Sequence, residues 1–218
     1  MKTGPVFTRP GPLGVRCFWQ LDRGELLGVA APPREAYAQI GTDAYAPDVD
    51  GDLEILWAVI KLLKPDLAIE IGTRQAVSTR TIVHAMQYAG CSRRLVTIDP
   101  DPACKAYLRG VNCTFLQAMG EEIFTHPVYS KHYAAVDFLF IDTDPHTYDQ
   151  TWRWLDTWVQ RVTPGGVVAF HDIVPARPEI QVADAIRDWL KGRAGWMWCE
   201  YPSPGTGAGI GLLWRLPR

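Results

Sequence analysis

The sequence predicts a doubly wound α/β fold with a mostly parallel, seven-stranded sheet and an antiparallel hairpin at its C-terminal end. Three observations support this prediction. Short apolar runs alternate with amphipathic helical segments, which is typical of a parallel sheet covered by helices on both faces. Polar residues directly follow several of these runs. The last two apolar runs have no helical segment between them, which favours an antiparallel pair.

The N-terminal quarter of the chain differs from the rest. The 218 residues suit one domain with a sizeable core, but the first fifty contain six prolines and little periodicity. We therefore expect residues 1–50 to form an irregular N-terminal arm or lid with one short helix near residues 34–40. Residues 51–218 are expected to form the domain that carries the site.

The first half of that domain is predicted to alternate helices and strands. Asp50 or Asp52 can cap a helix that extends to about Leu63, because its apolar residues then share one face, and Pro65 ends it. Gly90 provides a stop for the next helix. In order, we expect a strand at 67–71, a helix at 76–88, a strand at 95–98, a short helix at 102–108 and a strand at 113–116.

The second half begins with a strand at 136–141 that is apolar on both faces. A helix is expected at 148–162, because its apolar residues recur at helical spacing. The sequence Pro164-Gly165-Gly166 predicts a type II turn. The remaining elements are expected to be a strand at 167–170, a helix at 180–191 and strands at 196–201 and 210–214.

Charge and composition argue against several classes of function. The formal net charge of −2 disfavours a broad nucleic-acid-binding face, and no polybasic segment indicates a membrane surface. No apolar run approaches the ~20 residues of a membrane-spanning helix. Residues 1–20 lack the apolar core of a signal peptide. We therefore expect a cytoplasmic protein with neither nucleic-acid nor membrane partners.

Cysteine and tryptophan usage adds two expectations. The five cysteines are scattered without a C-x-x-C pair, which disfavours a zinc site or a disulfide framework and agrees with a reducing compartment. Nine tryptophans is a high number, explained either by packing in the core and at an interface or by an aromatic wall for a flat substrate. We favour packing, and the surplus together with the N-terminal arm favours a homodimer.

A glycine-containing loop after the first strand is the first candidate ligand site. Gly72 lets the backbone turn sharply beside a ligand, and the helix that follows points free N–H groups at it. Arg74, Gln75 and Ala76 fill the loop more than a pyrophosphate tolerates, so a ligand without phosphates is favoured. Asp99 ends the second strand, where an acid can bind a ribose diol or simply cap the next helix.

Ionisable residues gather after two other predicted strands. Asp142, Asp144 and His146 follow the fourth strand, and His171 and Asp172 end the fifth. Neighbouring parallel strands lie ~4.8 Å apart, so these side chains can converge on one cation. Magnesium prefers oxygen ligands, which the aspartates offer. The alternative is that the aspartates cap the following helices and the histidines are ordinary loop residues.

Four segments in sequence order carry a family resemblance: E-I-G-T…S-T, V-T-I-D-P, F-I-D-x-D…Y and P-G-G-V-V-x-F-H-D. With them the chain resembles the class I S-adenosylmethionine-dependent methyltransferases, whose sheet is Rossmann-like. The resemblance covers roughly residues 50–215. It is strongest for the small-molecule O-methyltransferase branch that includes the cephalosporin-hydroxylase-like and the catechol-type, metal-dependent enzymes.

The resemblance implies a set of residues around the cofactor, S-adenosyl-L-methionine. The implied residues are Glu70, Gly72, Thr73 and Ser78 at the methionine end, Asp99 at the ribose, Ala118 and Met119 at the adenine, and Asp142. The chain departs from the family at Ala76, which replaces a glycine, and at Met119, where relatives often have a polar residue.

The resemblance also implies how the reaction proceeds. Metal-dependent relatives bind magnesium with acids after strands four and five, so Asp142, His171 and Asp172 would hold a magnesium or manganese ion that stabilises the acceptor hydroxyl in its deprotonated form. His171 stands where relatives often have an acid. His146, with Asp142 the expected catalytic pair, is the candidate base because imidazole titrates near neutral pH. Pro145 occupies the position of the catechol-type lysine.

Several alternatives stay open. The enzyme could be a metal-independent N- or O-methyltransferase, or the protein could bind the cofactor without catalysis. A nicotinamide-dependent dehydrogenase is disfavoured because G-x-G-x-x-G is absent, and nucleic-acid methylation because no N-P-P-Y-type element is present. The acceptor is expected to be a small molecule. Candidate contributors from the arm are Arg9, Arg16, Trp19, Tyr37 and Tyr45.

Overall fold

A computed structural model of the chain describes residues 21–33, 36, 50–91, 94–175, 178–203 and 208–217. Its strands are β1 (Leu67–Ile71), β2 (Arg94–Asp99), β3 (Thr114–Gln117), β4 (Val136–Ile141), β5 (Val162–Phe170), β6 (Trp196–Pro202) and β7 (Gly209–Arg215). Its helices are α1 (Arg23–Ala30), α3 (Asp50–Leu63), α4 (Val77–Tyr88), α5 (Cys104–Tyr107), α6 (Glu122–Thr125), α7 (Pro127–His132), α8 (Tyr148–Asp156), the 3-10 helix η3 (Val159–Arg161) and α9 (Val182–Leu190). No helix in these ranges is long and apolar enough to cross a membrane.

The strands form one seven-stranded sheet in the order β3-β2-β1-β4-β5-β7-β6. Strands β1 to β5 pair in parallel, whereas β7 inserts antiparallel between β5 and β6. The predicted fold class is therefore confirmed. The strand order reverses between β1 and β4, and ligands of open α/β sheets bind beyond the carboxyl ends of the strands at such a point.

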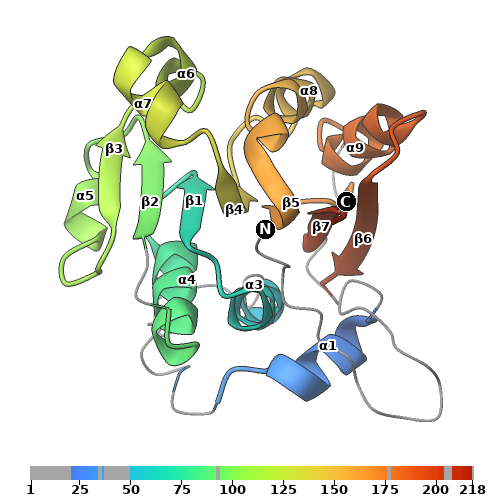
Figure 1. Ribbon diagram of the computed structural model, residues 1–218, viewed down its shortest axis with the longest axis horizontal. Coiled ribbons are helices and arrows are strands. Elements are labelled where there is room, and N and C mark those ends of the chain that lie inside the picture. Colours follow the sequence, from blue (N-terminus) through green and yellow to red (C-terminus); the bar gives the residue numbers. More distant parts are fainter. Residues whose placement is uncertain are drawn as a thin grey trace.

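Helices cover both faces of the sheet (Figure 1). Helices α1, α3 and α4 lie on one side, and α8 and α9 lie on the other. Side chains alternate along β4 accordingly: Phe138 and Phe140 pack toward the α3 side, and Leu139 and Ile141 pack toward the α8 side. This alternation decides which face receives each residue that follows a strand, and therefore which helix it meets.

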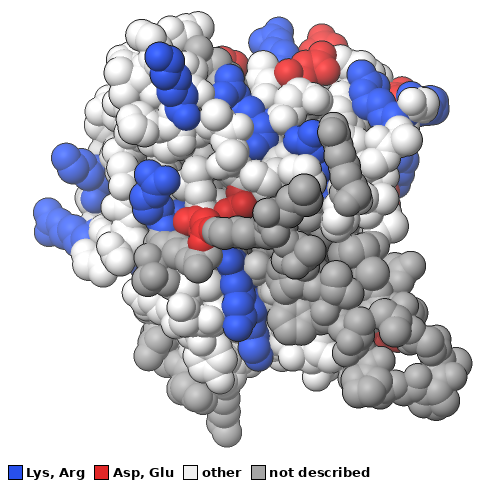
Figure 2. All heavy atoms as spheres, in the orientation of Figure 1, with Lys and Arg blue, Asp and Glu red and all other residues white. Residues whose placement is uncertain are grey.

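Several tryptophan side chains pack in the core. Trp57, Trp158 and Trp189 are among the largest fully buried side chains, and Trp154 is buried as well. The favoured explanation, packing in the core, is confirmed for Trp57, Trp158 and Trp189, whereas Trp154 also lines a cavity. On the face shown in Figure 2, basic side chains stand apart from one another, with acidic ones among them near the top and centre of the view. That distribution agrees with the near-neutral net charge.

The structure corrects two expectations about the N-terminal part of the chain. A regular helix, α1, occupies part of the predicted irregular arm, and it begins with a capping box in which Asp22 Oδ1 accepts from Glu25 N and Glu25 Oε2 accepts from Asp22 N. Asp52 does not cap α3, because it lies inside the first turn of that helix. The expected helix at 34–40 lies outside the described residues except for Ala36.

The segment between α8 and β5 is also different from the prediction. The helix expected at 148–162 ends at Asp156, and η3 separates it from β5, which already begins at Val162. The predicted Pro-Gly-Gly turn lies inside β5. Gly165 has the positive φ of 85° that such a turn requires, and the β4–β5 register shifts there. Helices α6 and α7 were not expected at all.

Candidate functional site

The loop after β1 brings the ends of two strands together at a glycine. Gly72 has a φ of 98°, and its N–H donates to the carbonyl oxygen of Ile98 at 2.9 Å. A Cβ atom at this position would lie 1.8 Å from the carbonyl oxygen of Asp142. Only glycine therefore allows the end of β1 to approach the end of β4 so closely.

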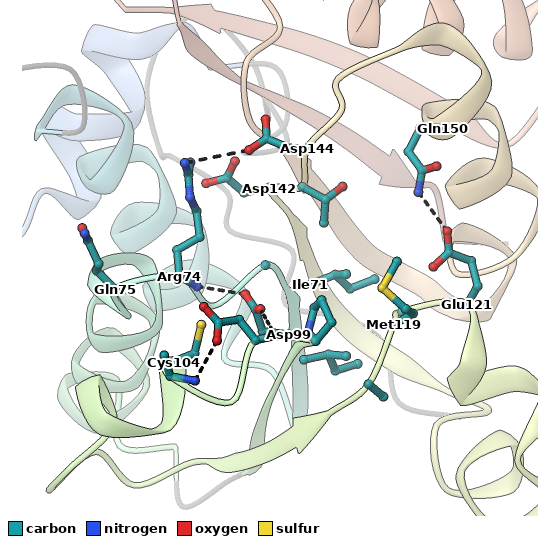
Figure 3. Close-up of a pocket in the computed structure, with 18 of the residues that line it drawn as sticks. Ile71, Arg74, Gln75, Asp99, Cys104, Met119, Glu121, Asp142, Asp144 and Gln150 are labelled. Atoms are coloured by element: carbon teal, nitrogen blue, oxygen red, sulfur yellow. Dashed lines mark hydrogen bonds and ion pairs between the residues drawn. The ribbon is translucent and has the colours of Figure 1, made fainter.

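Asp99 ties this loop to the end of β2. Its Oδ2 accepts hydrogen bonds from the backbone N–H groups of Thr73 at 2.9 Å and Arg74 at 3.1 Å, and its Oδ1 accepts from Asp101 N at 2.9 Å. The side chain is 8% exposed and borders a cavity (Figure 3). Asp99, which is expected to bind the ribose of the cofactor, therefore also holds the loop that is expected to bind the methionine end.

Glu70 lies behind the loop. Its carboxylate is fully buried and accepts from the hydroxyls of Ser78 at 2.6 Å, Thr79 at 2.5 Å and Thr97 at 2.6 Å. Burial raises the pKa of Glu70 to about 7, against the effect of these three hydrogen bonds. Glu70 lines neither of the two cavities that adjoin this loop, and in this structure its carboxylate supports the loop through these hydroxyls.

Helix α4 begins next to this loop without a side-chain cap. Its N-cap residue, Ala76, has a φ of 61°, a left-handed conformation that glycine adopts more readily. Thr73, Val77 and Ser78, around the start of the helix, line a cavity of about 100 Å³. The N-terminus of a helix carries partial positive charge and suits an anionic group such as an amino-acid carboxylate.

A larger cavity, of about 470 Å³, opens on the other side of the loop. This volume lies within the range of small-molecule and cofactor sites. Asp99, Ala118 and Met119 line it, as expected from the sequence, and Met119 is 47% exposed. The two cavities share a common set of bordering residues: Gly72, Arg74, Gln75 and Asp142. Figure 3 shows Arg74 extending toward Asp144 above the larger cavity.

Ionisable side chains converge beside the smaller cavity. Among the described residues, Asp142, His146 and Asp172 form a group whose candidate ligand atoms all lie within 4.8 Å of one another. His146 Nε2 lies 3.6 Å from Asp142 Oδ1 and 3.1 Å from Asp172 Oδ2, and its Nδ1 lies 3.3 Å from Asp144 Oδ1. The structure thus places His146, expected as the base, with the two acids expected as ligands.

His171 approaches the same two acids from another direction. Its Nδ1 lies 3.5 Å from Asp142 Oδ1 and 3.3 Å from Asp172 Oδ2. Asp172 turns out of β5 with a φ of 53°, a backbone conformation that is uncommon outside glycine and tends to occur at functional sites. Asp142, His146, His171 and Asp172 therefore lie together, as expected. The sequence predicted a base in one histidine and a cation ligand in the other, but both face the same two acids.

The charges of this group stabilise one another. Burial raises the pKa of Asp142, but the neighbouring imidazoles of His171 and His146 outweigh it and hold that pKa well below its usual range. The pKa of Asp172 is lowered in the same way. Burial lowers the pKa values of both histidines, but the surrounding carboxylates outweigh it and raise them. Without a cation, the two histidines supply the positive charge.

The side chains of this group fit a divalent cation. Nε2 of His146 and both ring nitrogens of His171 are buried and form no hydrogen bond of acceptable geometry within the described part of the chain, although carboxylate oxygens lie close to all three. Buried polar atoms without a partner are unfavourable, and bound ions are one way of satisfying them. Two carboxylates with imidazole nitrogens are a donor set for magnesium, manganese or a first-row transition metal.

Three residues of the site were not predicted. Thr97 donates to Glu70 from the middle of β2. Trp154, in the second turn of α8, lines the larger cavity. Asp52 reaches His171 from α3, with Oδ2 3.2 Å from His171 Nε2. Asp52 had a sequence signal, because it is an acid at the start of a helix with an apolar face, but that signal predicted a cap.

Comparisons with known proteins agree with this geometry. Residues 69–173 match the family model described as a methyltransferase domain. The matched region runs from β1 to the end of β5, and it includes the loop at Gly72 as well as the group of acids and histidines. No curated protein sequence matches the chain.

Solved structures share the fold at low sequence identity. A Klebsiella pneumoniae protein provisionally described as an O-methyltransferase has a TM-score of 0.66 at 16% identity and covers 91% of this chain and 98% of its own. The O-methyltransferase TomG from Streptomyces achromogenes, involved in tomaymycin synthesis and solved with S-adenosylmethionine, has a TM-score of 0.62 at 19% identity and coverages of 87% and 93%. An O-methyltransferase from Bacillus cereus, in complex with S-adenosylhomocysteine, has a TM-score of 0.61 at 15% identity and covers 88% of each chain.

The methyltransferase model matches the part of the chain that builds the candidate site, and the remainder of the sheet has the fold of these enzymes. Residues 69–173 are therefore a methyltransferase domain, and together with the fold they support an S-adenosylmethionine-dependent methyltransferase, consistent with the class I family that the sequence resembles.

Proposed function

We propose that this methyltransferase transfers the methyl group to a hydroxyl of a small molecule, and that a divalent cation at Asp142, His146 and Asp172 assists the reaction. The observation that carries the proposal is the position of Asp142. This residue borders both cavities and belongs to the group of potential cation ligands, so it joins the expected cofactor site to the expected reaction centre. The O-methyltransferases of similar fold support the same acceptor class.

The cofactor is proposed to span the two cavities. Its adenosine would occupy the 470 Å³ cavity beside Asp99, Ala118 and Met119. Its amino-acid end would pass Gly72 and reach the uncapped start of α4, where Ser78 lines the smaller cavity. Glu70 would act through the loop, because its carboxylate holds Ser78 and Thr79 instead of facing the cofactor.

Methyl transfer from a sulfonium requires no covalent intermediate on the protein, so the main tasks of the site are positioning and electrostatics. A cation held by Asp142, Asp172 and His146 would orient the acceptor hydroxyl and favour its deprotonated form. The carboxylates of Asp142 and Asp172 would attract the cation. Without a cation, the same two carboxylates would disfavour binding of an anionic acceptor.

A second candidate function keeps the fold without the cation. His146 Nε2 lies 3.1 Å from Asp172 Oδ2, an arrangement in which an acid orients an imidazole as a base. In that arrangement Nε2 carries the hydrogen that Asp172 accepts and Nδ1 is the base, whereas a metal bound at the same place would need Nε2 without its hydrogen. The two functions therefore make opposite use of one atom. The expected homodimer, the cytoplasmic location and the boundary at residue 50 remain predictions.

Metal removal separates the two candidates. The purified protein would be treated with EDTA, then supplied with S-adenosylmethionine and a panel of catechols and other hydroxylated acceptors, with and without Mg²⁺ or Mn²⁺. We expect turnover only after metal is restored, and a loss of roughly 100-fold in Asp142→Asn, on the scale of removing a charged contact. Asp184→Asn, a change at a mostly exposed acid on α9, is the matched control.

The outcomes are distinct. Full activity in EDTA with a loss in His146→Ala would favour the metal-independent enzyme. Calorimetric binding of S-adenosylhomocysteine without turnover of any acceptor would favour a binding protein. Transfer to amines but not to hydroxyls would contradict the proposed acceptor class.

A further inference from the structure

A buried carboxylate on α3 contacts the reacting side of the site from behind. Asp52 is 1% exposed, and its Oδ2 lies 3.2 Å from Nε2 of His171. Its other oxygen, Oδ1, accepts a short hydrogen bond from the hydroxyl of Ser203 at the end of β6. A buried carboxylate is strongly unfavourable unless it is paired, so a position like this one calls for an explanation.

The local structure holds this carboxylate in place. Asp52 lies in the first turn of α3, where the helix dipole stabilises a negative charge. The start of α3 is itself fixed from outside, because Arg23 on α1 donates to the carbonyl oxygen of Gly51 at 2.6 Å. With Oδ1 engaged by Ser203, only Oδ2 remains for the imidazole.

The ring of His171 is consequently held from three directions. Asp52 faces Nε2, and Phe140 packs against the ring at a centroid distance of 6.5 Å and an interplanar angle of 77°. On the opposite edge, Nδ1 faces Asp142 Oδ1 and Asp172 Oδ2 at 3.5 and 3.3 Å. The alternation along β5 explains the direction: Phe170 packs on the α8 side, so the next residue points toward α3.

We infer that Asp52 is a positioning residue for the reaction centre. It accepts the Nε2–H of His171 and so directs the Nδ1 lone pair into the space between Asp142 and Asp172, where a divalent cation can take it as a further ligand. Ser203 in turn holds Asp52. A carboxylate that orients a metal-binding histidine in this way is a recurring arrangement in proteins. The inference deepens the proposed function and rests on it for the cation.

A purely structural role would be different. In that case Asp52 would only link α3 to β5 and β6, and its removal would lower stability without changing how His171 meets a cation. The isosteric variant Asp52→Asn separates the two roles, because its amide keeps the size of the side chain but can turn an N–H toward His171. Ser203→Ala keeps Asp52 and removes the hydrogen bond that holds it.

The test measures cation binding directly in the metal-free, full-length protein. Mn²⁺ affinity would be determined by calorimetry for the wild type, Asp52→Asn, Ser203→Ala and the control Glu54→Gln, a neighbouring acid on α3 that pairs with Arg23. We expect a 10- to 100-fold weaker affinity in Asp52→Asn, a smaller loss in Ser203→Ala and none in Glu54→Gln. S-adenosylhomocysteine affinity should stay within about twofold in Glu54→Gln, whereas Asp52 lines the smaller cavity and is not expected to be neutral for the cofactor.

A spectroscopic readout accompanies the affinities. In the Mg²⁺-loaded wild type, imidazole ¹⁵N shifts should show His171 protonated at Nε2 and unprotonated at Nδ1, and this single tautomer should be lost in Asp52→Asn. Unchanged Mn²⁺ affinity and an unchanged tautomer in that variant would overturn the inference and leave the proposed function intact. If the wild type binds neither cation, both the cation site and the positioning role are refuted.

Discussion

Replacing Gly72 by alanine tests the tightest contact of the site. The added Cβ atom would lie 1.8 Å from the carbonyl oxygen of Asp142 and 2.8 Å from its carbonyl carbon. Both atoms belong to the backbone, so no side-chain rotation relieves the clash, and the ends of β1 and β4 must separate. Because both cavities share Gly72 and Asp142, this separation deforms the cofactor site and the group of acids together.

The expected magnitude has two parts. A φ of 98° disfavours any residue with a Cβ, by roughly 1–2 kcal/mol. Forcing an extra carbon into a close-packed contact adds roughly 1–3 kcal/mol. We therefore expect Gly72→Ala to lower the free energy of unfolding by roughly 2–5 kcal/mol. Gly90→Ala isolates the first part, because Gly90 has a φ of 71° and a Cβ there would meet nothing within 4 Å.

The assay combines urea unfolding with calorimetric titration of S-adenosylhomocysteine. Gly72→Ala should lose more stability than Gly90→Ala and should bind the cofactor product at least tenfold more weakly, whereas Gly90→Ala should bind like the wild type. Equal destabilisation of the two variants would refute the role assigned to the strand contact. Wild-type affinity in folded Gly72→Ala would refute the placement of the cofactor across this loop.

Three further variants test the supporting residues. Burial raises the pKa of Glu70 from 4.5 to about 7, so the unfolded chain loses this proton first, and stability should fall by about 3 kcal/mol between pH 4.5 and 7 and level off above. Glu70→Gln should remove this fall in urea unfolding, and an unchanged pH profile would contradict the burial argument. Asp99→Asn leaves one oxygen where two now accept N–H groups, so we expect roughly tenfold weaker S-adenosylhomocysteine binding by calorimetry; undiminished affinity would count against Asp99 as an organiser of the loop. Trp158→Phe removes the donor to the carbonyl oxygen of Gly120 at 3.0 Å, and thermal unfolding should show a loss of roughly 1–3 kcal/mol that Trp196→Phe, a change at a partly exposed ring, does not reproduce.

Strong periodicity made most of the fold predictable. The strands β1 and β4 have the predicted bounds, because short runs that are apolar except for one acid and are bounded by turn residues favour buried strands. The end of the helix expected at 148–162 was predicted wrongly. The apolar residues continue at helical spacing beyond Thr157, although the helix ends at Asp156. The capping box of Asp22 and Glu25 is a sequence signal for the start of α1. The prolines elsewhere in residues 1–50 favoured an irregular segment instead.

The site was predictable where it follows strand ends. Asp142 and Asp172 were placed correctly beside each other, because parallel neighbouring strands fix where their next residues lie. Side-chain direction was not predictable. Separate roles were predicted for the two histidines, but Nε2 of His146 and Nδ1 of His171 both face the same two acids. Asp52 approaches from a helix more than a hundred residues away in sequence.

The insertion of β7 between β5 and β6 has a consequence for how the molecule assembles. Ser203 is 151 residues from Asp52, and the hydroxyl of Tyr201 donates to the carbonyl oxygen of Leu21 at a separation of 180 residues. Such contacts close very long loops, and they form only after the C-terminal hairpin has left the ribosome. We expect nascent chains that stop before β6 to collapse around β1 and β4 without Ser203, which holds Asp52 beside His171. The reaction centre would therefore be completed late in synthesis.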